Sequence, residues 1–135
     1  DWGRLGKYKD IFSFFQYMIR FRKTHRLVRA NVSGGACGFP DVSFHGVKPW
    51  CSSFAEYERY VGVMFAGREE GKGPQTAYIA SNAYWEELDV ELPVLPDGME
   101  WELAADTWED TPCPGPLRAD GFRIRPRTVV VLVGK

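Results

Sequence analysis

Histidine and cysteine are scarce in this sequence, which limits the metal and disulfide chemistry that it can support. The 135 residues contain two histidines, His25 and His45, and three cysteines. The histidines are too few and too far apart to complete a zinc site with Cys37, Cys51 and Cys113, and no C-x-x-C pair occurs. We therefore expect no metal and no cofactor. An odd number of scattered cysteines fits a cytoplasmic location better than a disulfide scaffold, although one disulfide beside one free thiol stays open.

The sequence also lacks a charge excess and a long hydrophobic run. Its formal net charge is −1, whereas a protein that binds nucleic acid electrostatically carries a basic excess. No stretch approaches the roughly 18 apolar residues of a membrane-spanning helix, and no signal peptide is visible. We expect neither a nucleic-acid partner nor a membrane partner. The chain opens on Asp1 and Trp2 without a methionine, in the middle of a pattern, so we expect it to be a piece of a longer protein.

What the sequence does have is an unusually apolar helix near its start. Asp10–His25 reads DIFSFFQYMIRFRKTH. At about 100° per residue its apolar side chains span an arc of roughly 220°, about twice what a helix needs to rest on one surface. They are Ile11, Phe12, Phe14, Phe15, Tyr17, Met18, Ile19 and Phe21. We expect one flank, including Phe12 or Phe21, to be exposed or covered by a second body. The alternative is that the rest of the chain, or a second copy, covers every ring.

After this helix the pattern changes to short strands. Residues 31–43 are small and Gly-rich, which is typical of a connector loop. The segments that follow predict a mainly β fold, an antiparallel two-sheet β-sandwich of about seven to eight strands. The expected strands are Ser43–Lys48, Tyr60–Ala66, Thr76–Ser81, Leu88–Leu92, Glu100–Ala105, Gly121–Arg125 and Thr128–Val133. The last is apolar on both faces, so we expect it to lie centrally between the sandwich core and a body such as the helix.

Four motifs, in this order, resemble one enzyme family. DW followed by KDIFSFFQYMIRFRKTH resembles the last helix of the catalytic (β/α)8 barrel in the α-amylase superfamily, and more closely its bacterial glycogen-debranching and isoamylase branch. FHGVKPW, from Phe44 to Trp50, resembles the start of that family's C-terminal domain. AYIASNAYWEELDVELP and IRPRTVVVL resemble two later segments of the same domain. HRLV after the helix, Thr128 in place of the usual serine, and the connector GGACGFPDV depart from the pattern and leave the closest subfamily open.

The resemblance implies how the chain is organised. Residues 1–30 would be the last helix of a missing catalytic barrel, residues 31–43 a connector loop, and residues 44–135 the C-terminal β-sandwich domain. The parent would be a cytoplasmic glycoside hydrolase that debranches glycogen with two carboxylates, and these would lie on barrel strands before Asp1. The carboxylates present here sit on outward strand positions or in turns, so no catalytic residue is expected. Whether the parent debranches, branches or transfers α-glucans stays open.

Two roles then remain for the chain itself. One is an inactive structural cap on the barrel, bound through the helix Asp10–His25, whose free face would also allow self-association. The alternative is a carbohydrate-binding module that contacts glycogen through exposed aromatics. Its candidate residues are Asn82, Tyr84, Trp85 and Trp50, with Tyr84 and Trp85 on opposite faces of one segment and Asn82 bonding sugar hydroxyls. Trp108 is a further candidate, whereas packing against the missing barrel is the favoured reading of Trp85.

Overall fold

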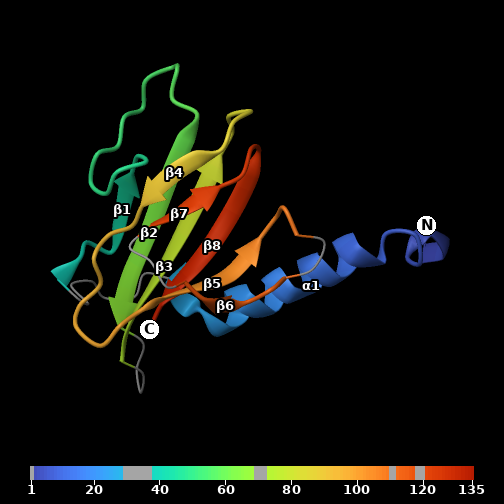
Figure 1. Ribbon diagram of the computed structural model, residues 1–135. Coiled ribbons are helices and arrows are strands. Elements are labelled where there is room, and N and C mark those ends of the chain that lie inside the picture. The colour runs from blue at the N-terminus through green and yellow to red at the C-terminus, as the bar shows by residue number, and fades with distance from the viewer. Residues whose placement is uncertain (1, 29–37, 69–72, 110–111, 118–120) are drawn as a thin grey trace.

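Two antiparallel sheets and one α-helix make up the computed structural model (Figure 1). The structure describes residues 2–28, 38–68, 73–109, 112–117 and 121–135. Within these residues a six-stranded sheet has the order β1-β2-β3-β8-β5-β6, and a two-stranded sheet pairs β4 with β7. The strands are β1 Val42–His45, β2 Tyr60–Arg68, β3 Pro74–Asn82, β4 Leu88–Glu91, β5 Trp101–Asp106, β6 Gly115–Pro116, β7 Gly121–Ile124 and β8 Thr128–Gly134. The prediction of a mainly β chain built from antiparallel sheets is confirmed.

The seven expected strands are all present, each within a few residues of its expected bounds. The strand that the sequence did not predict is β6, which lies in a Pro-rich segment. It pairs with β5 through two residues only, Glu102 with Pro116 and Leu103 with Gly115. Proline lacks the backbone donor that a sheet ladder needs, and this confines such a segment to a sheet edge.

Strand β8 occupies the centre of the larger sheet, between β3 and β5, as its two apolar faces predicted. Val130 and Leu132 point into a core that the two sheets share. Val131 and Val133 point to the opposite face, into a second cluster beneath the helix. Because successive side chains of a strand alternate between faces, one apolar run serves both cores.

The core between the sheets is built around large buried rings. The smaller sheet contributes Val90 and Ile124, and the larger sheet faces them with Met64, Tyr78 and Trp101 among others. The indole Nε1 of Trp101 donates a hydrogen bond to the carbonyl oxygen of Pro93, at 3.0 Å. Trp101 is buried and lies between Glu100 and Glu102 in the sequence.

The helix α1, Lys9–Thr24, begins and ends within one residue of the predicted bounds. It crosses the face of the larger sheet that is turned away from β4 and β7, and its N-terminal end extends past the β5–β6 edge (Figure 1). A β-bulge lies between Leu103 and Ala105 in β5, and the Tyr17 hydroxyl donates to the freed carbonyl oxygen of Ala104 at 2.7 Å. Short 3-10 helices flank α1, η1 at Trp2–Arg4 and η2 at Arg26–Val28.

One buried hydroxyl in the larger sheet gives a direct stability test. Thr76 Oγ1 is buried and has no hydrogen-bond partner among the described residues, whereas the equally buried Thr128 hydroxyl donates to the carbonyl oxygen of Pro126 at 2.9 Å. Thr76→Val removes an unsatisfied polar group at constant shape, so we expect it to raise the unfolding free energy by about 1 kcal/mol. Thr128→Val is expected to lower it by a similar amount. Urea unfolding of both variants measures this, and equal destabilisation by the two would contradict it.

Candidate functional site

The helix α1 presents two different apolar stripes. Four side chains pack against β5, β8 and β3: Phe14, Tyr17, Met18 and Phe21. A second stripe, spaced at i, i+3, i+4, i+7 and i+11, is exposed: Tyr8, Ile11, Phe12, Phe15 and Ile19. Phe15 is 66% exposed and Ile19 is 54% exposed. We call this second set the exposed stripe. Phe12 therefore lies on the free flank, as expected, whereas Phe21 is buried at 8% exposure.

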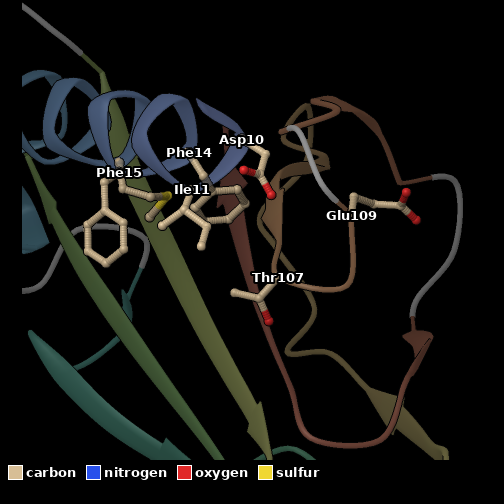
Figure 2. A pocket seen from close by; sticks show the side chains of 7 residues that line it. Asp10, Ile11, Phe14, Phe15, Thr107 and Glu109 are labelled. Atoms are coloured by element: carbon tan, nitrogen blue, oxygen red, sulfur yellow. The ribbon is translucent and has the colours of Figure 1, made fainter. Parts of the chain in front are cut away.

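A groove runs between the two stripes and the segment that follows β5. Figure 2 shows Ile11, Phe14 and Phe15 projecting from the same side of α1, with Thr107 and Glu109 across from them. The groove has a volume of about 360 Å³ and is walled mainly by apolar side chains, with Asp10 and Glu109 at its rim. A concave apolar wall with few polar groups is the usual form of a binding site.

The predicted aromatic pair Tyr84 and Trp85 lies in the segment between β3 and β4. Trp85 is 64% exposed. The two rings do not point to opposite faces of the segment, because their centroids are 4.4 Å apart with 32° between the planes. Tyr84 thus supports the Trp85 indole instead of forming a second platform.

Asn82, the predicted hydroxyl-binding residue, has a structural role. It is 1% exposed. Its Nδ2 donates to the carbonyl oxygens of Glu86 at 2.9 Å and Arg125 at 3.0 Å, and its Oδ1 accepts from the Tyr84 backbone at 2.9 Å. These bonds use both amide donors and fix the turn that carries Trp85. The side chain that the sequence assigned to a ligand instead positions an exposed ring.

Trp50, the fourth predicted residue, lies beside β1, away from the other three. Its backbone φ is 64°, and its backbone N–H donates to Nδ1 of the buried His45 at 3.0 Å. The two rings meet edge to face with centroids 4.7 Å apart, and His45 Nε2 lies 2.8 Å from Ser43 Oγ. Because Nδ1 accepts, Nε2 carries the proton and donates to Ser43. Trp50 covers a neutral buried histidine.

This arrangement predicts a pH dependence of stability. Burial lowers the pKa of His45, so the folded chain takes up the proton only at a lower pH than the unfolded chain. The stabilisation is complete above the ordinary value of 6.5 and is lost as the pH falls below it. We expect the urea concentration at the midpoint of unfolding to decrease as the pH is lowered from 7.5 to 5.5. His45→Phe should flatten that slope and His25→Gln should preserve it; a slope unchanged by His45→Phe would contradict the assignment.

A second depression, of about 450 Å³, brings Trp85 together with Trp108, which lies just after β5. Trp108 is 54% exposed. The lining of this depression also includes Thr107, Pro126, Arg127 and Thr128. Trp85 and Trp108 are 23 positions apart in the sequence, and no local spacing indicates that they share a site. The pairing follows from sheet register, because Asn82 lies opposite Thr128 and Asp106 lies opposite Val130.

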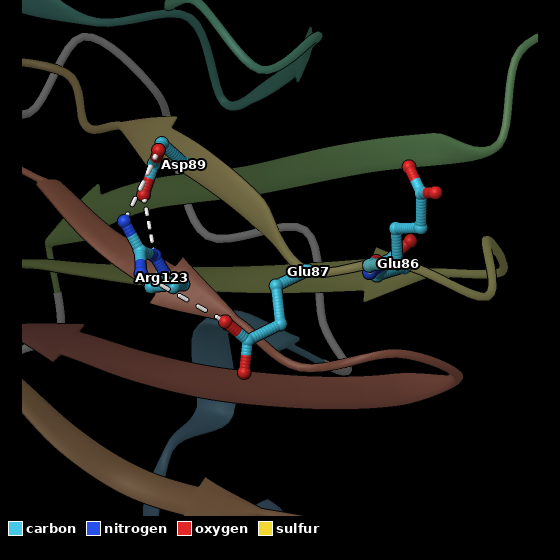
Figure 3. Close-up of polar contacts among 5 residues, drawn as sticks. Glu86, Glu87, Asp89 and Arg123 are labelled. Atoms are coloured by element: carbon cyan, nitrogen blue, oxygen red, sulfur yellow. Dashed lines mark hydrogen bonds and ion pairs between the residues drawn. The ribbon is translucent and has the colours of Figure 1, made fainter.

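The carboxylates on the smaller sheet form surface ion pairs. Arg123 Nε donates to Asp89 Oδ1 at 2.8 Å, and its Nη1 lies 3.9 Å from Glu87 Oε2, while Glu86 points elsewhere (Figure 3). The hydrogen bond and charge of Asp89 raise the pKa of Arg123. Both carboxylates therefore belong to a surface ion-pair network around one guanidinium.

The described residues contain no group of three or more His, Cys, Asp or Glu side chains placed to hold a metal ion. No helix among them is both long and apolar enough to cross a membrane. Cys51 and Cys113 are free and exposed, whereas Cys37 lies outside the described residues.

Comparisons with known proteins add no relative. No protein-family model matches the chain, and no curated protein matches it. The exposed stripe of α1 and the two depressions are therefore the features of the described residues that bear on function.

Proposed function

We propose that this chain is the non-catalytic C-terminal part of a glycogen-debranching, isoamylase-like glycoside hydrolase, and that it caps the enzyme's catalytic barrel through α1. The observation that carries the proposal is the exposed stripe. A helix that packs Phe14 and Phe21 on its own sheet also offers Phe15 and Ile19 to a second body. Large apolar side chains at helical spacing on one exposed face mark an interaction surface.

The size of this surface fits a stable interface. The stripe continues toward the N-terminus through Trp2 and Leu5, which are also exposed. Taking about 200 Å² for each large apolar side chain, the exposed parts offer on the order of 700 Å². A typical specific interface covers about 800 Å² on each partner. The largest apolar patch of an ordinary monomer is smaller, at roughly 300–600 Å².

Charge favours a different protein body over a second copy as the occupant. The segment from Trp2 to Val28 contains a single acidic residue, Asp10. Its basic residues are Arg4, Lys7, Lys9, Arg20, Arg22, Lys23 and Arg26. Pairing two such helices would bring like charges together, which costs free energy at an interface. A complementary occupant has an apolar face with an acidic rim, and the order of the four sequence motifs favours a (β/α)8 barrel in that place.

The first test is the sequence encoded immediately before Asp1. We expect barrel strands that end in Asp and Glu there, and the isolated chain should release no reducing sugar from glycogen, amylopectin or pullulan. Sugar release above the blank by a clean preparation of the chain would overturn the non-catalytic assignment. A complete gene without a barrel would overturn the cap.

A matched pair of substitutions tests the docking itself in the complete gene product. Phe15→Glu places a charge in the exposed stripe. Gln16→Glu makes the same charge change at the next residue, which lies on the polar side of the helix. We expect Phe15→Glu to lower the melting temperature of the complete product by several degrees, because it buries an unpaired carboxylate. Gln16→Glu should leave that temperature unchanged. Equal effects of the two substitutions would contradict docking through this stripe.

A further inference from the structure

Three turns meet at one end of the larger sheet and form the depression that holds Trp85 and Trp108. The Arg127 backbone N–H donates to the Tyr84 carbonyl oxygen at 3.1 Å, which joins the turn before β8 to the turn after β3. The Val129 N–H donates to Thr107 Oγ1 at 2.9 Å, and the Thr107 N–H donates to the Val129 carbonyl oxygen at 3.0 Å. These bonds hold the two tryptophan-bearing segments on the same strand, β8.

Each indole is supported on one side and exposed on the other. The Tyr84 ring packs against Trp85 with a tilt of 32° between the planes. The Arg125 guanidinium lies 5.2 Å from the centre of the Trp108 ring, and Glu109 holds that guanidinium with a bond of 3.0 Å. The Trp108 backbone N–H also donates to Asp106 Oδ1 at 2.9 Å. Two large flat surfaces are thus fixed in place before any ligand arrives, which lowers the entropy cost of binding.

Arg127 contributes a guanidinium to the depression, and its backbone conformation is strained. It follows Pro126 in the turn between β7 and β8, and its φ is 51°. Proline followed by a residue of positive φ is the pattern of a type II turn, in which glycine is favoured at the second position. A bulky side chain there is strained, and strained residues of this kind cluster at binding sites. The exposed Arg127 side chain lines the depression, and none of the described residues forms an ion pair with it.

The chemistry of this lining indicates the ligand class. One face of a pyranose ring is a flat array of C–H groups, and its edge carries hydroxyls that both donate and accept. Indole faces suit the first, while the Arg127 guanidinium and the Thr107 hydroxyl, which both line the depression, suit the second. A polyproline peptide would also stack on the rings, but it has no backbone donor for the hydroxyl acceptor. The mixture of donors and acceptors favours a sugar.

We infer that the depression between Trp85, Trp108 and Arg127 is a binding site for the hexopyranose rings of an oligosaccharide. The inference does not depend on the proposed function, because no residue of α1 lines this depression. An experiment that refutes docking of α1 therefore does not refute sugar binding at this depression, and the reverse also holds. Compared with the residues expected from sequence, the site keeps Trp85, gives Tyr84 and Asn82 supporting roles, and replaces Trp50 by Trp108 and Arg127.

The indole N–H signals of the five tryptophans in a ¹⁵N-labelled full chain provide the test. On titration with maltoheptaose or cellohexaose we expect the Trp85 and Trp108 signals to move and to saturate. The buried Trp101, bonded to Pro93, and Trp50 should stay in place as internal references. Binding of either sugar supports the site and identifies the linkage it prefers. Movement of neither signal with either sugar, or movement with decaproline alone, would overturn the inference.

Arg127→Gly separates binding from folding. Glycine relieves the positive φ, so the melting temperature should stay equal or rise, while the affinity for the bound sugar falls at least tenfold. Trp85→Ala and Trp108→Ala should each cause a comparable loss of affinity. Arg123→Ala removes a guanidinium from the smaller sheet, outside the depression, and should keep full affinity. Full affinity in Arg127→Gly would contradict the role of this side chain.

Discussion

Replacing Phe21 by alanine is expected to lower the unfolding free energy by about 3 to 5 kcal/mol, the usual cost of truncating a buried phenylalanine. Phe21 is the most deeply buried side chain of α1 and packs against Ala104, Ala105 and Val131 of the larger sheet. Its ring also stacks on His25 with centroids 4.1 Å apart. Truncation would leave a cavity at the point where the helix is held most firmly, so the C-terminal half of α1 should loosen as well.

Phe15→Ala is the matched control, because it removes the same atoms from the exposed stripe of the same helix. In the isolated chain it should change the unfolding free energy by no more than about 0.5 kcal/mol. Urea unfolding of both variants, followed by far-ultraviolet circular dichroism, measures the difference. If the two variants are equally destabilised, α1 does not have one packed stripe and one free stripe.

Gly62→Ala is expected to destabilise the fold by about 3 kcal/mol or more, because the added methyl group has no room. A Cβ at Gly62 would overlap the Oη and Cζ atoms of Tyr78. Tyr78 is completely buried, and its hydroxyl is bonded to the Tyr60 hydroxyl at 3.1 Å. Burial raises the pKa of both hydroxyls, so both stay protonated and bonded. Neither ring can turn aside without breaking the core between the sheets.

Two further variants make the Gly62 experiment specific. A Cβ at Gly73 meets no atom within 4 Å, so Gly73→Ala should be neutral or slightly stabilising. Tyr78→Phe removes the oxygen that a Cβ at Gly62 would meet first, so Gly62→Ala combined with Tyr78→Phe should cost less than the sum of the two single changes. Melting temperatures of the four proteins provide the data, and strict additivity would show that the overlap is not the cause.

Strands β1, β2 and β4 could be predicted from sequence because their burial follows a period of two over most of their length. In LDVEL the apolar Leu88, Val90 and Leu92 contribute to the core between the sheets while Asp89 and Glu91 are exposed. The sequence of β8, which is apolar on both faces, likewise indicated its central position. The width of the apolar arc on α1 predicted that one flank of the helix would be left exposed, and the exposed stripe confirms this part of the prediction. The partner that would cover the stripe stays a prediction. A two-residue strand such as β6 carries no period and could not be found in this way.

The candidate binding residues were harder to predict because side-chain roles depend on contacts distant in sequence. Asn82 looked available for a ligand, yet its amide is used by Arg125, 43 positions away. Trp85 and Trp108 share a depression only because β3 and β5 both flank β8. The positive φ of Arg127 could not be predicted either, because a proline at the same turn position also fits a type I turn, which accepts most residues after it. Strand register and turn geometry determine which residues meet at this depression, and neither can be predicted from residue types alone.

The central proposal is that the exposed stripe of α1 is covered by another part of the complete gene product. Carbene footprinting of the isolated chain and of the complete gene product tests it most directly. The account predicts that labelling of Phe15 and Ile19 falls at least tenfold in the complete product, while Gln16, on the polar side of the same helix, is labelled equally in both. Equal labelling of Phe15 and Ile19 in the two proteins would contradict it.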